Sequence, residues 1–119
     1  MTETQDLLHK IIEGIQEKKG KKIVCIDLSE LEGLVYNHFV ICEGDSTTHV
    51  NAIADSVRDY VRKNARTKPF ASDGFQNAQW IVFDYGDILV HVFSRETREY
   101  YRLESLWSDA KVTEITDVY

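Results

Sequence analysis

The chain has 119 residues, 43% hydrophobic and 29% charged, which is the composition of an ordinary globular domain. We therefore expect a single domain that spans residues 1–119 and buries its own core. The net charge of −6 argues against binding to bare nucleic acid, because phosphate neutralisation needs a clustered positive surface. No apolar run is long enough to cross a bilayer.

The N-terminus and the cysteines indicate the compartment. The first residues, M-T-E-T-Q-D, are acidic where a secretory signal is basic and then apolar, so a cytoplasmic location is expected. Cys25 and Cys42 each lie inside an apolar, strand-like run, which favours buried free thiols over a disulfide. Because they do not form a C-x-x-C pair, the sequence predicts no metal site.

The first helix is expected where apolar residues recur at helical spacing: Leu7, Leu8, Ile11, Ile12 and Ile15. Thr2 or Thr4 is available as its N-cap, and Lys18-Lys19-Gly20 is a typical end for a helix.

Two buried strands and a second helix follow. Residues 22–28, K-I-V-C-I-D-L, are apolar on both faces, as in a central strand covered on two sides, and residues 38–42 form a second such run. The segment E-G-D-S-T-T then predicts a strand-to-helix turn in which Asp45 or Ser46 caps a helix that ends near Asn64.

Basic residues gather where the two helices end: Lys18, Lys19, Lys21 and Lys22, and then Arg58, Arg62, Lys63, Arg66 and Lys68. Cations there favour the helix dipole, and neither cluster interleaves with aromatic residues, so direct contact with RNA is expected to be minor or absent. The segment K-N-A-R-T-K-P-F-A-S-D-G-F is by composition the most flexible interior part of the chain.

Residues 80–93, W-I-V-F-D-Y-G-D-I-L-V-H-V-F, read as two strands joined by a tight turn. If Tyr85 and Gly86 form a two-residue loop, Asp84 faces Asp87 and Trp80 faces His91. Side chains alternate between faces, so one face should be purely apolar and lie on the core: Ile81, Phe83, Ile88, Val90 and Val92.

The opposite face is mixed: Trp80, Val82, Asp84, Asp87, Leu89, His91 and Phe93. Two interpretations are open. Asp84 could cap the turn by accepting its backbone N–H groups. Alternatively, the acidic tip could await a cationic partner, with Trp80 as a flat apolar anchor beside it. This face could equally lie under a helix.

After the hairpin, residues 95–107, R-E-T-R-E-Y-Y-R-L-E-S-L-W, predict one or two short helical turns that carry Tyr100, Leu103, Leu106 and Trp107. The tail, residues 110–119, has weak periodicity and is expected to fray.

An enzyme is the competing hypothesis, in the form of a metal-dependent nucleotide-binding or nucleotidyltransferase-like protein. Asp27, Asp84 and Asp87 are carboxylates at strand ends, and E-G-D-S-T-T could offer a helix N-terminus to a phosphate. Against it, the chain has neither G-x-x-x-x-G-K nor G-x-G-x-x-G, and His91 has no Ser or Cys partner at a diagnostic spacing. We therefore expect no catalytic residues and no cofactor.

Four segments together resemble the bacterial ribosomal silencing factor family, also called the Iojap family. They are I-V-C-I-D-L, then H-F-V-I-C-E-G-D-S followed by H-V-N-A-I-A-D, then the hairpin W-I-V-F-D-Y-G-D-I-L-V-H-V-F, and finally Y-Y-x-L-E-x-L-W, which ends at Trp107. Their order and spacing match from Gly20 to Ala110.

The resemblance implies an α/β fold: a small mixed sheet flanked by helices, with nucleotidyltransferase-like topology but without the catalytic acids. It implies a translational repressor that docks on the large ribosomal subunit, through the fourteenth large-subunit protein on the intersubunit face, and blocks joining of the small subunit. No reaction is catalysed, and family members can form homodimers off the ribosome.

The resemblance carries over to individual residues of the hairpin. Trp80 matches the family's aromatic residue, Asp84, Gly86 and Asp87 match the turn acids and glycine, and His91 matches the strand histidine. With Tyr85, these are the predicted partner-binding residues, although Tyr85 stands where Leu is frequent, so its hydroxyl is not expected to be essential. Two departures, Asn37-His38 and the acids Glu43 and Asp45, argue against a ligand role for the turn before the second helix.

Overall fold

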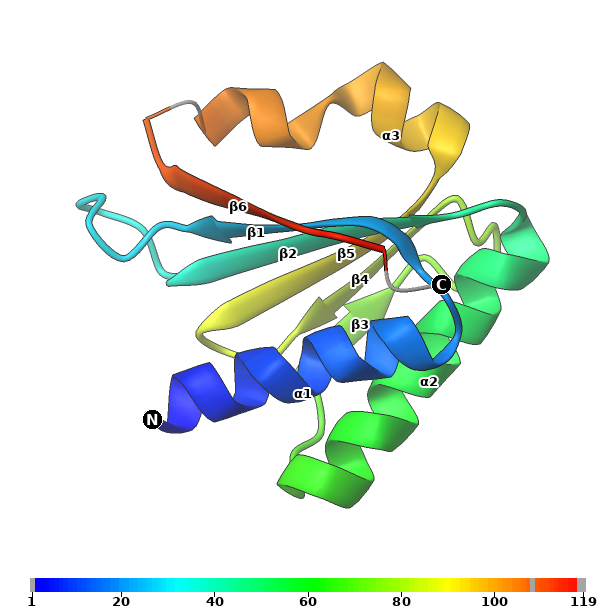
Figure 1. Ribbon diagram of the computed structural model, residues 1–119, viewed down its shortest axis with the longest axis horizontal. Helices are drawn as coiled ribbons and strands as arrows, with labels where there is room; N and C mark the ends of the chain where they lie inside the picture. Colours follow the sequence, from blue (N-terminus) through cyan, green and yellow to red (C-terminus); the bar gives the residue numbers. More distant parts are fainter. Residues whose placement is uncertain (1, 108, 118–119) are drawn as a thin grey trace.

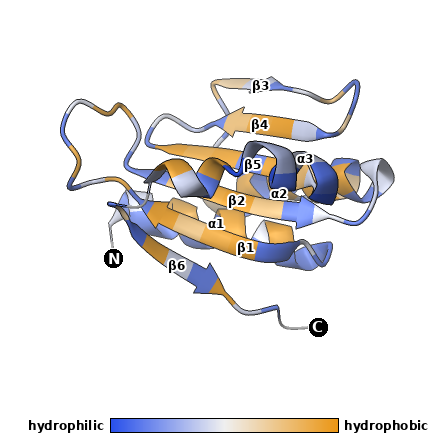
Figure 2. Ribbon diagram, turned by 90° about the horizontal axis from the view of Figure 1, so that it is seen from above, coloured by the Kyte–Doolittle hydropathy of each residue, from blue (hydrophilic) through white to orange (hydrophobic). Residues whose placement is uncertain are grey.

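A six-stranded mixed sheet forms the centre of the molecule, with helices on both faces (Figure 1). The strand order is β3-β4-β5-β2-β1-β6; β2 and β5 run parallel, and the other neighbouring strands are antiparallel (Figure 2). Helices α1 and α2 cover one face, and α3 with the short 3₁₀ helix η1 covers the other. The predicted α/β fold is thereby confirmed.

The computed structural model describes residues 2–107 and 109–117. In chain order the elements are α1 (Glu3–Glu17), β1 (Lys21–Asp27), β2 (His38–Gly44), α2 (Thr47–Ala65), β3 (Ala71–Asp73), β4 (Trp80–Asp84), β5 (Ile88–Ser94), α3 (Arg95–Tyr101), η1 (Leu103–Trp107) and β6 (Lys111–Ile115). Of the helices in this part of the chain, none combines the length and the apolarity that crossing a membrane requires.

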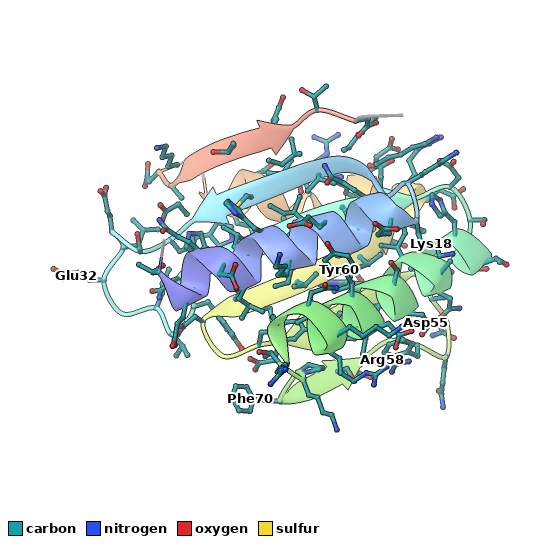
Figure 3. The ribbon with its side chains drawn as sticks, turned by 60° about the horizontal axis from the view of Figure 1, so that its bottom comes forward. Lys18, Glu32, Asp55, Arg58, Tyr60 and Phe70 are labelled. Atoms are coloured by element: carbon teal, nitrogen blue, oxygen red, sulfur yellow. The ribbon has the colours of Figure 1, made fainter. Side chains whose placement is uncertain are left out.

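The two long helices begin at the residues that the sequence indicates. Thr2 caps α1 in a capping box with Gln5, and the Ser46 hydroxyl accepts the His49 N–H at the start of α2. The helices pack against each other (Figure 3) and are in close contact at Gly14, where a Cβ atom would lie 3.0 Å from the Cα atom of Val57. Their apolar stripes and the facing sides of β2, β4 and β5 form the main core.

The hairpin of β4 and β5 has a different register from the predicted one. Its loop is Gly86-Asp87, closed by a hydrogen bond from the Tyr85 N–H to the Ile88 carbonyl (2.9 Å). Asp84 therefore faces Leu89 and not Asp87, and Trp80 faces Phe93 and not His91. The register moves because Tyr85 continues the strand and buries its ring, which is 4% exposed, while Gly86 takes the loop position that needs a positive φ (90°).

The shift of two residues preserves the two faces of the hairpin, because side chains alternate with a period of two. The predicted core face is confirmed: Ile81, Phe83, Ile88, Val90 and Val92 are all 0% exposed. The mixed face lies under α3 and η1, where Phe93 and the partly buried Trp80 and Leu89 join a second apolar cluster with Phe39 and Trp107.

The C-terminal tail is a strand, so the expectation that residues 110–119 fray is wrong for Lys111–Ile115. These residues pair antiparallel with β1, from Ile23↔Ile115 to Asp27↔Lys111. The sequence signal is weak because β6 lies at the sheet edge with its side chains largely exposed, so no hydrophobic alternation marks it. Residues 118 and 119 lie outside the described part. The basic interior segment likewise contains a short edge strand, β3.

A buried ion pair attaches α3 to the sheet. Arg98 (7% exposed) donates to Glu43 Oε1 at the end of β2 (3.2 Å), and Glu43 itself is 3% exposed. The same guanidinium donates to the Lys22 carbonyl (2.7 Å) and to Glu104 Oε1 of η1 (3.1 Å). The register of β1 is irregular between Lys21 and Val24, and Lys22 adopts φ 49°, which distinguishes this carbonyl from an ordinary ladder position. Arg98 therefore joins β1, β2 and η1 to α3.

We expect Arg98→Met to lower the free energy of unfolding by about 3 kcal/mol, because it leaves the Glu43 carboxylate buried without its main partner. The loss should lie at the lower end of the usual range, since the half-exposed Arg95 still contacts Glu43 Oε2 at 3.1 Å. The double variant Arg98→Met/Glu43→Leu should recover part of the loss. Urea denaturation measures both.

The matched control is Arg62→Met, which removes an exposed ion pair with Asp59 on α2 (3.2 Å) and should cost about 0.5 kcal/mol or less. An Arg98→Met variant as stable as this control would contradict the role given to the buried pair.

Candidate partner-binding surface

Trp80 begins β4 and lies partly buried among aromatic rings of the α3 side. Its ring stacks on Phe93 (centroids 4.9 Å apart) and contacts Tyr101 of α3 at 5.0 Å. The indole N–H donates to His91 Nδ1 (3.0 Å), which fixes the orientation of the ring. Trp80 is therefore partly exposed, and its contacts with the buried residues His91 and Phe93 hold its ring in place.

His91 supports Trp80 from inside the protein. It is 3% exposed and packs against Phe39 (5.0 Å) and Phe93 (6.0 Å). Burial lowers the pKa of His91 from 6.5 to about 4, so at neutral pH the imidazole is uncharged and its Nδ1 can accept the indole N–H. Because His91 is buried, it can shape the surface only through the residues that it contacts, among them Trp80.

At the hairpin tip, the acids have intramolecular partners. Asp84 Oδ1 accepts the Gly86 N–H (2.8 Å), and its Oδ2 accepts the Tyr36 hydroxyl (3.0 Å), which raises the pKa of Tyr36. Asp84 therefore caps the turn, as the first of the two interpretations holds. Asp87 is exposed and accepts the Thr4 hydroxyl at 3.1 Å. Tyr85 is buried, and burial raises its pKa to about 12.

The sequence-predicted site residues do not form one surface. Trp80 and Asp84 occupy opposite ends of β4, about 14 Å apart at the usual rise per residue. The expectation of an acidic tip beside Trp80 is therefore wrong, because strand length separates the two. The structure brings Trp80 and His91 together and leaves Asp84, Gly86 and Asp87 at the far end with the buried Tyr85.

The neighbours of Trp80 are two residues that the sequence placed in a helix without assigning them a surface role. Tyr100 is 82% exposed and Tyr101 is 52% exposed. With Trp80 and Glu96 they line a groove of about 410 Å³ between α3 and the segment before β4, to which Asn77 and Gln79 contribute amides. Consecutive helical residues point about 100° apart, so a Tyr-Tyr pair cannot bury both rings on one face. The adjacent Tyr-Tyr pair in the sequence therefore predicts that at least one of the two rings is exposed.

The region proposed for phosphate in the enzyme hypothesis is occupied by the protein's own charges. Asp45, directly before the Ser46 cap of α2, pairs with Lys21 (2.9 Å) and Arg95 (2.8 Å), and these cations lower its pKa. A second anion there would meet this carboxylate and the nearby Glu43. The two Cys residues are buried free thiols, as predicted, and burial raises the pKa of Cys25 to about 11 and of Cys42 to about 12.

Within residues 2–107 and 109–117, no three or more His, Cys, Asp and Glu side chains are grouped to hold a metal ion. The fold and the groove together define a small α/β domain with exposed aromatic side chains on one face. The family is shown by comparison with known proteins: a family model described as "Ribosomal silencing factor during starvation" matches residues 1–119, and the chain belongs to this ribosomal silencing factor family.

Individual relatives agree with this assignment. The ribosomal silencing factor RsfS of Halalkalibacterium halodurans is 32% identical over 114 residues, with 96% of each chain covered. The RsfS of Bacillus subtilis is 36% identical over 99 residues, which cover 83% of this chain and 82% of the relative. A crystal structure of a Chromobacterium violaceum protein superposes with a TM-score of 0.82 at 31% identity, over 96% of this chain and 94% of that one.

We expect the stability of the protein to fall between pH 6.5 and 4 because of His91. In this window the unfolded chain binds a proton at His91 that the folded protein does not, so the stabilisation present above pH 6.5 is lost as the pH falls. The loss attributable to this group is about 3 kcal/mol. It is measured as the difference in pH dependence of urea unfolding between the wild type and His91→Gln, which keeps an acceptor but does not titrate. Identical pH profiles would show that His91 is not held neutral.

Proposed function

We propose that this protein represses translation by binding the large ribosomal subunit and blocking the small subunit from joining. Family membership supports a role at the ribosome. A mouse relative, 29% identical over 97 residues that cover 80% of this chain and 42% of its own length, is named "Mitochondrial assembly of ribosomal large subunit protein 1", which names the large subunit. The direct partner that we propose is the fourteenth large-subunit protein, on the intersubunit face.

The observation that carries the proposal is the groove of Trp80, Tyr100 and Tyr101. Tyrosine and tryptophan dominate binding energy at protein interfaces, and a tyrosine with 82% of its surface exposed, such as Tyr100, gains the most from being covered. The carboxylate of Glu96 on the groove, and the net charge of −6, suit a basic partner whose Lys or Arg side chains can lie over the aromatic rings. Ribosomal proteins have that chemistry.

The docking residues that we propose follow from this geometry. Trp80 remains the anchor of the surface, with Tyr100 and Tyr101 beside it and His91 as its support. Asp87 could contact the partner only if the interface extends along β4 to the hairpin tip, where Asp84 and Gly86 shape the turn. Tyr85 contributes to the core.

Steric exclusion is sufficient for the proposed repression. The domain measures 36 × 33 × 28 Å, so a copy bound on the intersubunit face would occupy a layer at least 28 Å thick even in its thinnest orientation. That thickness is several times the reach of a side chain, so the subunits could not make their contacts around it. The function requires no catalysis and places the protein in the cytoplasm with the ribosomes. Off the ribosome, a homodimer that covers the same groove would protect its aromatic rings.

We expect the double variant Tyr100→Ala/Tyr101→Ala to bind isolated large subunits at least about 2 kcal/mol more weakly than the wild type, roughly thirtyfold in affinity. Both side chains are exposed, so folding should be unchanged. Co-sedimentation with large subunits measures binding, and formation of whole ribosomes measures repression.

Phe70 supplies the matched control because it is also 82% exposed but lies at the hairpin-tip end of the molecule, projecting from the ribbon in Figure 3. Phe70→Ala should bind like the wild type. Equal binding by the double tyrosine variant would remove the groove from the interface, and unhindered subunit joining in the presence of bound wild type would reject steric exclusion.

Association with large subunits should slow as salt rises from low to physiological ionic strength. The reason is that salt screens the attraction between the acidic chain and a basic partner. Stopped-flow mixing at several salt concentrations measures the association rate. Glu96→Gln should reduce the salt dependence, whereas a rate that does not change with salt would argue against a basic partner.

A further inference from the structure

The outer edge of β6 leaves hydrogen-bonding capacity open on the surface. β6 is the last strand of the sheet, and within the described residues it pairs only with β1 (Figure 2). Four of its five residues are exposed. A strand edge of this kind presents a row of backbone donors and acceptors that another extended chain can pair with.

The register identifies which backbone groups point outward. The Leu28 N–H donates to the Asn37 carbonyl toward β2, and N–H groups alternate along a strand, so Val24 and Ile26 also point toward β2. Their antiparallel partners on β6 are Glu114 and Val112. The N–H and C=O groups of Val112 and Glu114 are therefore directed away from β1, to the open edge.

A mainly apolar groove lies on the α1 side of this edge. It has a volume of about 400 Å³ between α1 and β6, and Leu8 and Ile12 of α1 line it together with Cys25 of β1. The β6 residues that face it are Lys111, Thr113 and Ile115. Polar side chains complete the lining at its margin: His9, Glu13, Asp27 and His38. Side chains on one face of an added strand would enter this groove.

A second groove, more acidic, lies on the η1 side. It has a volume of about 560 Å³, and it is lined by Val112 (45% exposed) and by three carboxylates, Glu104, Glu114 and Asp117. The cations at this groove are Lys22 and Arg98, and Arg98 is already paired with Glu43 and Glu104. Side chains on the other face of an added strand would meet an excess of negative charge.

We propose that the edge of β6 binds an extended, basic segment of a partner polypeptide as a seventh strand. An added strand satisfies the outward backbone groups of Val112 and Glu114 and fills both grooves at once, which a helix or a folded surface cannot do. Basic side chains on the η1 side complement the three carboxylates, and apolar ones fit the α1 side. The charged edge residues Lys111 and Glu114 disfavour pairing with neutral strands.

A second copy of this chain fits the edge less well. When two β6 strands pair across a two-fold axis through Thr113, Glu114 of each lies opposite Val112 of the other, so the carboxylate gains no cation. The proposed occupant is therefore a different polypeptide, and the surface is separate from the groove of Trp80, Tyr100 and Tyr101.

The probe is the peptide acetyl-Val-Lys-Val-Lys-Val-Lys-amide, added to the full chain and followed by NMR and amide hydrogen exchange. Its valines suit the α1-side groove and its lysines the η1-side groove. Binding should slow exchange at Val112 and Glu114 by about tenfold or more, while Thr113, which faces β1, changes little. A matched peptide with Glu in place of Lys should not bind.

Two variants separate backbone pairing from charge. Glu114→Pro removes one outward N–H and should weaken binding of the lysine peptide by about tenfold or more. Glu114→Lys keeps that N–H and reverses the charge, so it should lose the lysine peptide and gain the glutamate peptide even if Glu114→Pro disturbs the strand.

Three results would overturn the proposal. The first is equal binding of the two peptides by the wild type. The second is protection of Ala71–Asp73 on the opposite edge in place of Val112 and Glu114. The third is protection of Val112 and Glu114 in the free protein that rises with protein concentration, because it would assign the edge to self-association.

Discussion

The placement of α3 and η1 on the sheet depends on one interaction, the buried ion pair of Arg98 and Glu43. One guanidinium reaches the end of β2, the carbonyl of Lys22 in β1, and Glu104 of η1. Because α3 has seven residues, less than the length at which an isolated helix is stable in water, its position rests on such tertiary contacts. The tyrosines of the proposed docking groove sit on this helix, so the charge pair inside the domain orients the aromatic surface outside it.

The sequence was sufficient for the parts of the fold with strong periodicity or clear capping chemistry. Thr2, Ser46 and the apolar face of the hairpin behave as local rules predict, because burial and capping both act within a few residues. The loop Gly86-Asp87 was mispredicted because two registers give the hairpin the same faces, and burial of the Tyr85 ring decides between them. β6 was not predicted because an exposed edge strand carries no alternation of polar and apolar residues.

The sequence predicted only part of the candidate site, because the rest depends on how α3 docks on the sheet. The hairpin alone was enough to place Trp80 and His91 on one face, but not to pair them. The predicted register set them directly opposite, whereas Trp80 pairs with Phe93 and His91 with Val82, so the two side chains meet diagonally. Tyr100 and Tyr101 reach Trp80 through the docking of α3, which depends on Arg98 and a strand about 55 residues earlier (98 − 43). The acids of the tip looked like part of the same surface because alternation predicts the face of a side chain but not its distance along the strand.

The parallel pairing of β2 with β5 has a consequence for the order in which the molecule can become active. His38 pairs with Ile88, fifty positions later (88 − 38), and every segment between them must be made before the centre of the sheet can close. The ring contact of Trp80 with Tyr101 and the hydrogen bond from Arg98 to Glu104 can form only after these later residues have been made. During its own synthesis the chain therefore lacks a finished aromatic groove until almost all of it has left the ribosome that makes it. Under the proposed function, a newly made molecule could bind other ribosomes only after α3 has docked on the sheet.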